Sequence, residues 1–223
     1  MKLHPSGSFR VMGLALVAAL ALVPRSAARA ESALVAESIS TSNVHWTWDP
    51  ATVVGTSKLV RTDSGISASF HGSGLTPGQA VTLWFVVFNN PEFCAASPCG
   101  PADFGNPDVK FDALYGGGHV VGGSGIANFG AHLPVGDTSG SVFTEMNPPG
   151  PTVGLIDPFG AEVHLMAHSH GPARTGQVLK TQISSFFGGC EVFLGPNGGI
   201  ADGPEDVPSS VGECSTIQVS VHK

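Results

Sequence analysis

Three histidines lie close together in a segment that has the alternating pattern of a β-strand. The segment Glu162–His170 (EVHLMAHSH) places His164, His168 and His170 at even spacings. Alternate side chains of a strand project from one face, where neighbours lie about 6.5–7 Å apart at Cα. Two imidazoles at that spacing can reach one ion at Zn–N distances of ~2.0–2.1 Å. The row therefore predicts a starting point for a zinc or copper site.

Further ligands would have to come from another part of the chain. His132 or His119, from segments that we expect to form other strands, could complete the site, and so could Glu162 on the same face as the row. Met166, on the same face as the row, would favour copper. The alternative is an ordinary solvated or hydrogen-bonded row, because one face of a sheet commonly meets water. Both interpretations stay open.

The sequence contains no complete catalytic motif. There is no Gly-x-Ser-x-Gly elbow, His-Glu-x-x-His helix, phosphate-binding loop with lysine or dinucleotide fingerprint. A non-enzymatic role is therefore favoured. A hydrolase that uses an unrecognised triad of its abundant His, Ser and Asp residues is an alternative.

Four cysteines occur in the chain, and they allow three pairings. We expect disulfides between Cys94 and Cys99 and between Cys190 and Cys214, because each pair closes a loop rich in Gly and Pro. Disulfides form and persist in oxidising compartments outside the cytoplasm.

The first 30 residues have the pattern of a secretory signal peptide. Lys2 and Arg10 precede the apolar run Val11–Val23, and small residues lead to Ala30. The apolar run is too short to span a bilayer. Cleavage after Ala30 would give an exported protein, periplasmic or extracellular, without a membrane span.

Removal of that segment would leave a markedly acidic chain. Of the ten Lys and Arg residues six remain, whereas all 17 Asp and Glu residues are kept, giving a net charge of about −11. The remaining basic residues are scattered singly, so no basic stripe is available to neutralise phosphates. The charge distribution therefore excludes nucleic acid as a partner.

Glycine and proline, 30 and 17 of 223 residues, interrupt almost every window long enough for an amphipathic helix. Strand-like segments recur between these turn residues, about eight in all. We expect an all-β, single-domain β-sandwich, immunoglobulin-like or superoxide-dismutase-like, with long Gly/Pro loops over residues 44–223. A mobile lead-in is expected over residues 31–43. The segments with strand character are Val44–Trp48, Lys58–Thr62, Gly65–His71, Val81–Phe88, His119–Val121, Ile126–Leu133, Glu162–Ser169, Gln177–Phe187 and Thr216–His222.

Some of these segments carry more specific expectations. Val81–Phe88 is apolar on both faces, which predicts a central strand that is covered on both sides. If one sheet covers one face, the other needs a loop or a partner, so a protein partner or a homo-oligomer is expected. His119–Val121 and Ile126–Leu133 are predicted to pair through the glycines between them. The run Gly116–Gly118 is interpreted as a tight turn.

The segment Ala167–Ala173 (AHSHGPA), with Gly176 after it, resembles the Ala-His-x-His-Gly-Pro-Ala motif of CHRD, or chordin-type, domains. The later Tyr-Val-Asn-x-His-Thr segment of that family has no counterpart here. This resemblance implies an all-β secreted module. The chain also resembles uncharacterised secreted bacterial β-rich proteins, a likeness that implies no particular activity. The segments that carry it are His45-Trp46, Gly74–Gly78, Asn89–Cys94, Gly118–Gly123 and Ser169–Ala173.

Taken together, these features favour a secreted β-sandwich that serves as a binding or surface-interaction module. The first alternative is a Cu- or Zn-binding metalloprotein, with redox chemistry, that uses the histidine row. The second is a hydrolase.

Overall fold

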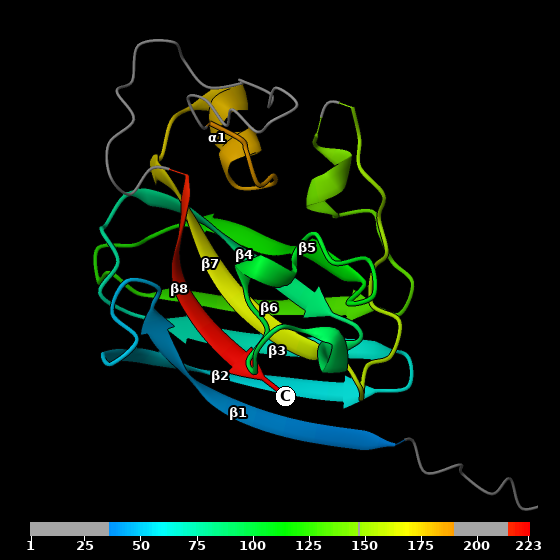
Figure 1. The fold of residues 1–223 in the computed structure, drawn as a ribbon. Helices are drawn as coiled ribbons and strands as arrows, with labels where there is room; N and C mark the ends of the chain where they lie inside the picture. Colours follow the sequence, from blue (N-terminus) through cyan, green and yellow to red (C-terminus); the bar gives the residue numbers. More distant parts are fainter. Residues whose placement is uncertain (1–35, 147, 190–213) are drawn as a thin grey trace, which may run out of the picture. The chain divides into compact units, whose positions relative to one another are not determined.

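The structure, a computed structural model, describes residues 36–146, 148–189 and 214–223. These residues form eight strands, one α-helix and three short 3-10 helices (Figure 1). The strands are β1 (Glu37–Trp46), β2 (Val53–Thr62), β3 (Gly65–Gly72), β4 (Gln79–Phe88), β5 (Phe111–Val120), β6 (Ala127–Pro134), β7 (Glu162–Pro172) and β8 (Ser215–His222). The helical elements are η1 (Pro91–Phe93), η2 (Pro101–Asp103), η3 (Val142–Thr144) and α1 (Gly176–Gln182). The predicted all-β class is confirmed.

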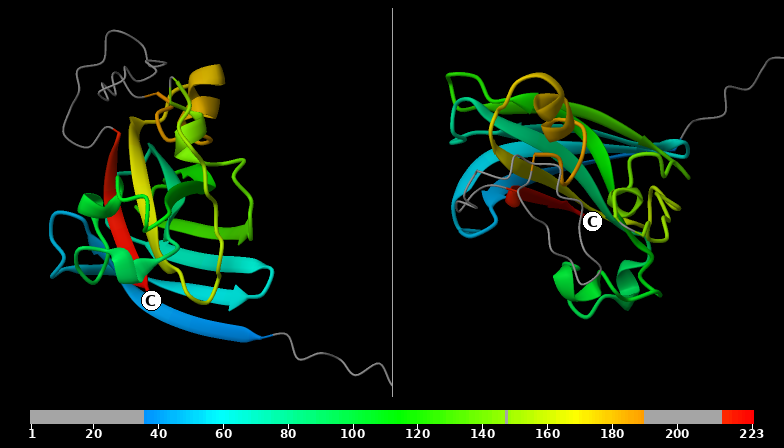
Figure 2. Two further views of the ribbon diagram at one scale, coloured as in Figure 1. Left: turned by 45° about the vertical axis from the view of Figure 1, so that its right-hand side comes forward. Right: turned by 90° about the horizontal axis from the view of Figure 1, so that it is seen from above.

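All eight strands belong to one antiparallel sheet, in the order β5-β4-β7-β8-β1-β2-β3-β6. The sheet curls so far that its two edge strands, β5 and β6, face each other (Figure 2). The ring of His119 on β5 stacks on Phe129 of β6, with centroids 4.8 Å apart. Gly116 allows this approach, because a Cβ there would lie 3.2 Å from the Cβ of Ala131. The sheet is therefore nearly closed, and the two layers around its core are two halves of one sheet.

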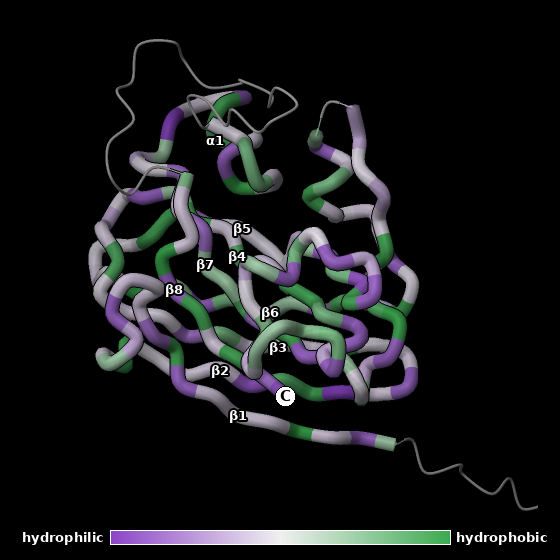
Figure 3. The backbone as a smooth tube through the Cα atoms, in the orientation of Figure 1, coloured by the Kyte–Doolittle hydropathy of each residue, from purple (hydrophilic) through white to green (hydrophobic). Residues whose placement is uncertain are grey.

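The core inside the curl is built from alternate residues of the strands. On β4, Val81, Leu83 and Phe85 are fully buried in it, and β7 contributes Val163 and Leu165. Burial of each such side chain stabilises the fold by roughly 1.5–3 kcal/mol relative to exposure. Hydrophobic residues, drawn in green, recur along these strands in Figure 3. The apolar face of β7 was predicted to point into the core, and this prediction is confirmed.

A second, smaller core lies on the outer face of β5, β4 and β7. Here Trp84, Val86 and Phe88, the alternate residues of β4, are buried under loops. The covering segments are residues 89–110, residues 135–161 and α1 with the residues that follow it. β4 is thus a central strand that is buried on both faces, as predicted, and loops of the same chain provide the outer cover.

The first predicted disulfide is present. Cys94 and Cys99 are joined with an S–S distance of 2.06 Å in the loop between β4 and β5. The second predicted pair includes Cys190, which lies outside the described residues, as does the predicted signal peptide. No helix in the described part of the chain is long and apolar enough to cross a membrane.

The prediction that His119–Val121 and Ile126–Leu133 pair with each other is wrong. His119 on β5 pairs with Val81 on β4, whereas Phe129 on β6 pairs with Phe70 on β3. The connection between β5 and β6 follows the β3–β4 turn, because the backbone N–H of Gly78 donates to the carbonyl of Val121. The two strands are therefore led to opposite edges of the sheet.

Three further expectations are corrected. Residues 177–187 are not a strand: they begin with α1, whose last residue, Gln182, donates through Nε2 to the carbonyls of His170 and Pro172. The run Gly116–Gly118 lies inside β5 and is not a turn. The expected mobile lead-in is wrong from Glu37 onward, because β1 begins there and pairs with β2.

The join between β1 and β8 is made largely by side chains. Their backbones pair only at His45 and Trp46. Farther along the join, Ser40 Oγ lies 2.8 Å from Nδ1 of His222, and Ser57 Oγ lies 2.9 Å from its Nε2. His222 is buried. The array formed by Ser40, Ser57 and His222 therefore replaces backbone hydrogen bonds in closing the sheet.

Arg61 on β2 strengthens the same join. Its buried guanidinium donates to the carbonyls of Pro158, Ala161 and His222. Burial lowers the pKa of Arg61, but its ordinary value is so high that the side chain stays charged. The three carbonyls satisfy that buried charge and fix the loop before β7.

Candidate functional site

The histidine row on β7 lies on the outer face of the sheet, as the strand period predicts, but loops bury it. His164, His168 and His170 are each at most 5% exposed. His164 Nε2 lies 2.8 Å from Glu162 Oε1, and its ring packs on Phe88 with centroids 5.0 Å apart. Burial outweighs the contact with Glu162 and lowers the pKa of His164. The row is therefore neutral and packed, rather than solvated, at pH 7.

His170 is fully hydrogen-bonded in one tautomer. Its Nδ1 lies 2.8 Å from the carbonyl oxygen of Gly188, which can only accept, so Nδ1 carries the proton. Its Nε2 then accepts from the hydroxyl of Thr82 at 2.9 Å, and that hydroxyl accepts from Nε1 of Trp84 at 2.8 Å. Burial lowers the pKa of His170 to about 4. The chain of bonds ties the segment after α1 to β4 and β7.

His168 stands beside it. Both of its ring nitrogens are buried, and neither has a hydrogen-bond partner among the described residues. The ring stacks on Phe186 at 4.2 Å and meets His170 edge-on at 5.0 Å. Burial, with a smaller contribution from His170, holds the pKa of His168 well below its ordinary value. A buried N–H without an acceptor costs about 1–3 kcal/mol.

The fourth predicted ligand lies elsewhere. His132 is on the exposed outer face of β6, where its Nδ1 lies 2.9 Å from the hydroxyl of Ser67. The structure therefore does not bring His132 to the row on β7. In the described residues, one group of three metal-type ligand atoms lies within 4.8 Å of one another: Cys94, Cys99 and Asp103. Its two sulfurs form the disulfide, so they are not available as thiolate ligands.

The array at the β1–β8 join is the arrangement that bears on the hydrolase alternative. Ser57 Oγ contacts Nε2 of His222, as a nucleophile would contact its base. However, Ser40 takes the place of a carboxylate at Nδ1, and Ser57 is only 3% exposed. The geometry therefore assigns this array to closing the sheet.

An apolar pocket opens between the outer face of the sheet and the loops that cover it. Its volume is about 510 Å³, which lies within the ~300–1,000 Å³ typical of small-molecule sites. Hydrophobic side chains make up almost all of the wall, and two threonines are the polar exceptions. The lining residues are Thr47, Trp84, Val86, Pro101, Phe104, Phe111, Ala113, Val142, Phe143, Met146, Met166, Phe186, Phe187 and Thr216.

Contacts among the aromatic rings hold the pocket wall in place. Trp84 meets Phe186 edge-on with centroids 5.0 Å apart, and Phe104 stacks on Phe111 at 4.3 Å. Phe143 meets Phe111 edge-on at 5.9 Å. Such pairs add about 0.5–1.5 kcal/mol each beyond the burial of their area. The rings come from β4, β5, η3 and two loops. The pocket therefore forms only when these loops are packed on the outer face of the sheet.

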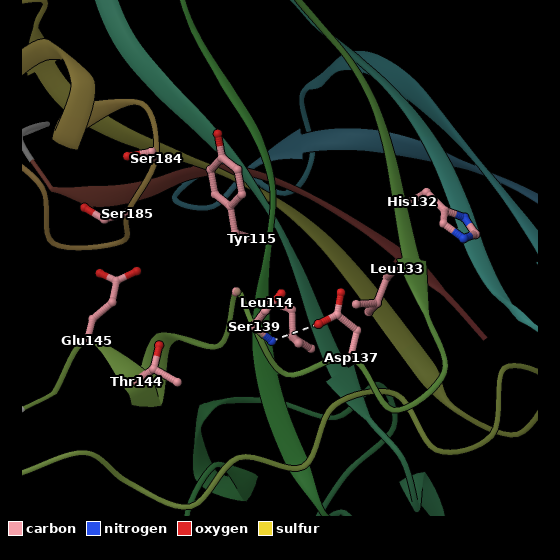
Figure 4. Close-up of a pocket in the computed structure, with 11 residues that line it drawn as sticks. Leu114, Tyr115, His132, Leu133, Asp137, Ser139, Thr144, Glu145, Ser184 and Ser185 are labelled. Carbon is pink, nitrogen blue, oxygen red and sulfur yellow. Dashed lines mark hydrogen bonds between the residues drawn. The ribbon is translucent and has the colours of Figure 1, made fainter.

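A second, polar pocket of about 400 Å³ lies beside η3 and the segment after α1 (Figure 4). Asp137 and Glu145 are at different ends of it, and the carboxylate of Asp137 accepts from the backbone N–H of Ser139. The hydroxyl of Tyr115 donates to the carbonyl of Ile183 at 2.5 Å. These groups mainly form hydrogen bonds with the backbone, so this pocket is the weaker candidate.

Sequence reasoning missed the apolar pocket. The doubly apolar pattern of Val81–Phe88 was a sign of this pocket, because such a strand needs a cover on its outer face as well as its inner face. Comparison with known proteins adds no assignment: no protein-family model, no curated protein sequence and no solved structure matches the chain. The function is therefore inferred from geometry, and the resemblance to CHRD domains stays a prediction.

Proposed function

We propose that this protein is a binding module that holds a small, largely apolar organic molecule in the pocket on the outer face of β4 and β7. The observation that carries the proposal is the pocket itself, about 510 Å³ and almost entirely hydrophobic. An apolar cavity of that size loses solvent-exposed hydrophobic surface when a ligand fills it, which favours binding.

The lining limits the kind of molecule that would fit. The hydroxyls of Thr47 and Thr216 offer the polar contacts, and Thr47 Oγ1 already donates to the carbonyl of Thr216 at 2.8 Å. Met146 and Met166 supply flexible thioether side chains that adapt to ligand shape. A ligand with several hydrogen-bonding groups would leave them unpaired, at a cost in affinity.

The proposed setting is outside the cytoplasm. The expected signal peptide and the disulfide between Cys94 and Cys99 support it. In that setting the protein would carry, store or sense its ligand, and chemistry on the ligand is not required.

A fluorescence titration tests the proposal. N-phenyl-1-naphthylamine, a neutral probe that brightens in apolar surroundings, is added to the purified protein. We expect a saturable, one-to-one rise in fluorescence. Met166→Trp should weaken probe binding at least about tenfold, because the larger ring fills the pocket from β7.

Val120→Trp is the matched control, since Val120 is 39% exposed on β5 and does not line the pocket. It should change affinity less than about twofold. Thermal unfolding of both variants checks that they are folded. The proposal fails if the wild-type protein shows no saturable binding, or if the two variants weaken it equally.

A further inference from the structure

Three carboxylates are next to lining residues of the apolar pocket in the sequence. Asp103, at the end of η2, is 3% exposed and immediately precedes the lining residue Phe104. Its two oxygens accept from the backbone N–H groups of Ala95 and Gly100, each at 2.8 Å. These hydrogen bonds lower the pKa of Asp103, so it is ionised at neutral pH.

Glu145 stands behind a different part of the wall. Its carboxylate accepts from the backbone N–H groups of Phe186 and Phe187 at 2.9–3.2 Å, and both of these residues line the pocket. The residue after it, Met146, also lines the pocket. Glu145 thus holds the aromatic segment after α1 in place and lies next to the space that the segment encloses.

Asp112 adds a third carboxylate, on the opposite face of β5 between the lining residues Phe111 and Ala113. It is fully buried and accepts from the hydroxyl of Ser141 at 2.6 Å and from the backbone N–H groups of Val153 and Gly154 at 2.8 Å. These hydrogen bonds satisfy the carboxyl oxygens of Asp112.

These carboxylates give the pocket a negative potential. The described lining residues include no charged side chain, and the residues next to them in the sequence include these three carboxylates and one exposed lysine, Lys110. Hydrogen bonds from amide groups stabilise a carboxylate without cancelling its net charge, and that charge acts strongly through a low-dielectric interior. Over residues 31–223, 17 acidic side chains face only six basic ones. The potential therefore favours a cation over an anion throughout the region.

The wall itself suits a cation. Six aromatic rings line the pocket, and the face of an aromatic ring carries negative charge density that attracts organic cations. Ammonium groups with alkyl substituents lose less hydration than a bare ion on entering such a site, and aromatic surroundings with nearby carboxylates are how proteins commonly recognise them.

We infer that the ligand of this pocket is a lipophilic organic cation, an alkylated or aromatic ammonium compound, rather than a neutral hydrophobe or a fatty-acid-like anion. This inference rests on the proposed function, because it specifies the ligand of the same pocket. The positive group lies among the aromatic rings, and the hydrocarbon part fills the rest of the pocket. An anion is repelled by Asp103 and Glu145.

Three compounds that share one skeleton test the inference. They are (2-naphthylmethyl)trimethylammonium, its uncharged carbon isostere 2-neopentylnaphthalene, and the anion 2-naphthylmethanesulfonate. Each is titrated against the purified protein with bound N-phenyl-1-naphthylamine, and its affinity is obtained from displacement of the probe. We expect the cation to bind about tenfold more tightly than the isostere. The anion should bind about tenfold more weakly than the isostere.

Two pairs of variants, each a test and its control, then locate the source of the preference. Glu145→Gln keeps an acceptor for the backbone N–H groups but removes the charge, and Glu37→Gln makes the same change at an exposed position on β1. Phe143→Leu removes one ring from the wall, and Phe159→Leu does the same at a 40% exposed position outside the pocket. The first variant of each pair should reduce the cation's advantage at least about threefold, and its control should leave that advantage unchanged.

The possible outcomes distinguish failure of this inference from failure of the proposed function. If the isostere binds as tightly as the cation or more tightly, the inference is wrong while the proposed function stands. The inference is also wrong if the cation's advantage is the same in Glu145→Gln and Phe143→Leu as in the wild type. If neither the probe nor any compound of the series binds, the proposed function itself is overturned.

Discussion

Two histidines, two residues apart on β7, differ in how their nitrogens are satisfied. His170 donates to Gly188 and accepts from Thr82, so both of its nitrogens have partners. His168 is as deeply buried, but no described residue offers either of its nitrogens a hydrogen bond. The same side chain is therefore stabilising at one position and costly at the other, because Gly188 after α1 and Thr82 on β4 provide partners only for His170.

The matched substitutions His168→Phe and His170→Phe test this difference. The first removes an unpartnered imidazole and keeps a ring against Phe186, so it should leave the free energy of unfolding at pH 7 unchanged or raise it by about 1 kcal/mol. The second removes the buried hydrogen bonds to Gly188 and Thr82 and should lower that free energy by about 1–3 kcal/mol. Urea unfolding measures both. Equal destabilisation by the two variants would contradict the assignment of His168.

At the scale of elements, Gly118 of β5 acts through the segment that lies over it. A Cβ on Gly118 would overlap the backbone of Ile183, the residue that follows α1 as its C-cap. Tyr115, three residues earlier on β5, donates its hydroxyl to the same carbonyl. The missing side chain at Gly118 thus lets the residues after α1 lie against the sheet and close one side of the pocket.

Gly118→Ala should therefore displace that segment. We expect the free energy of unfolding to fall by about 1–3 kcal/mol and the amides of residues 181–189 to exchange faster with solvent. Gly130→Ala, on β6, is the control, because a Cβ there meets no atom within 4 Å. Its free energy of unfolding should change by less than about 0.5 kcal/mol. Unchanged exchange in Gly118→Ala would refute the proposed role of this glycine.

Sequence patterns predicted the strands that have a strong period of their own. The doubly apolar run of β4 and the alternation of β7 were assigned correctly, including which face of β7 meets the core. The helix α1 escaped prediction, because its sequence is compatible with either structure and the hydrogen bonds of Gln182 to the end of β7 decide between them. Contacts distant in sequence override local preference here.

The pocket was harder to predict than the fold, for a physical reason. Its rings come from segments as far apart as Trp84, Phe143 and Phe186, and no spacing in the sequence relates them. The histidine row had a recognisable spacing and was placed on the correct face. What the pattern could not indicate was that loops bury this face, so that its histidines pack on Phe88 and Phe186.

At the scale of the whole molecule, buried neutral histidines make the fold sensitive to acid. The pKa values of His170 and His222 are lowered to about 4, mainly by burial, and those of His164 and His168 are also lowered. In the unfolded chain each of these groups would titrate near 6.5. The unfolded state therefore takes up protons first as the pH falls.

Stability should be complete above about pH 6.5 and should decline steadily towards pH 4, by about 3 kcal/mol for a histidine buried as deeply as His170. Urea unfolding at pH 7.5, 6.5, 5.5 and 4.5 measures the slope. Asp103 and Asp137, whose pKa values are lowered, lose their contributions only below about pH 4, so the two effects occupy separate ranges. A free energy of unfolding that stays constant from pH 7.5 to 4.5 would rule out the buried neutral state of these histidines.

The order of the strands also determines when the sheet can be completed during folding. β8 joins β5-β4-β7 on one side to β1-β2-β3-β6 on the other, although it follows all of them along the chain. Until Ser215–His222 is in place, the chain can assemble two separate half-sheets but not the join between them. Completion of the sheet, and of the buried contacts across it, must therefore wait for the strand that comes last in the chain.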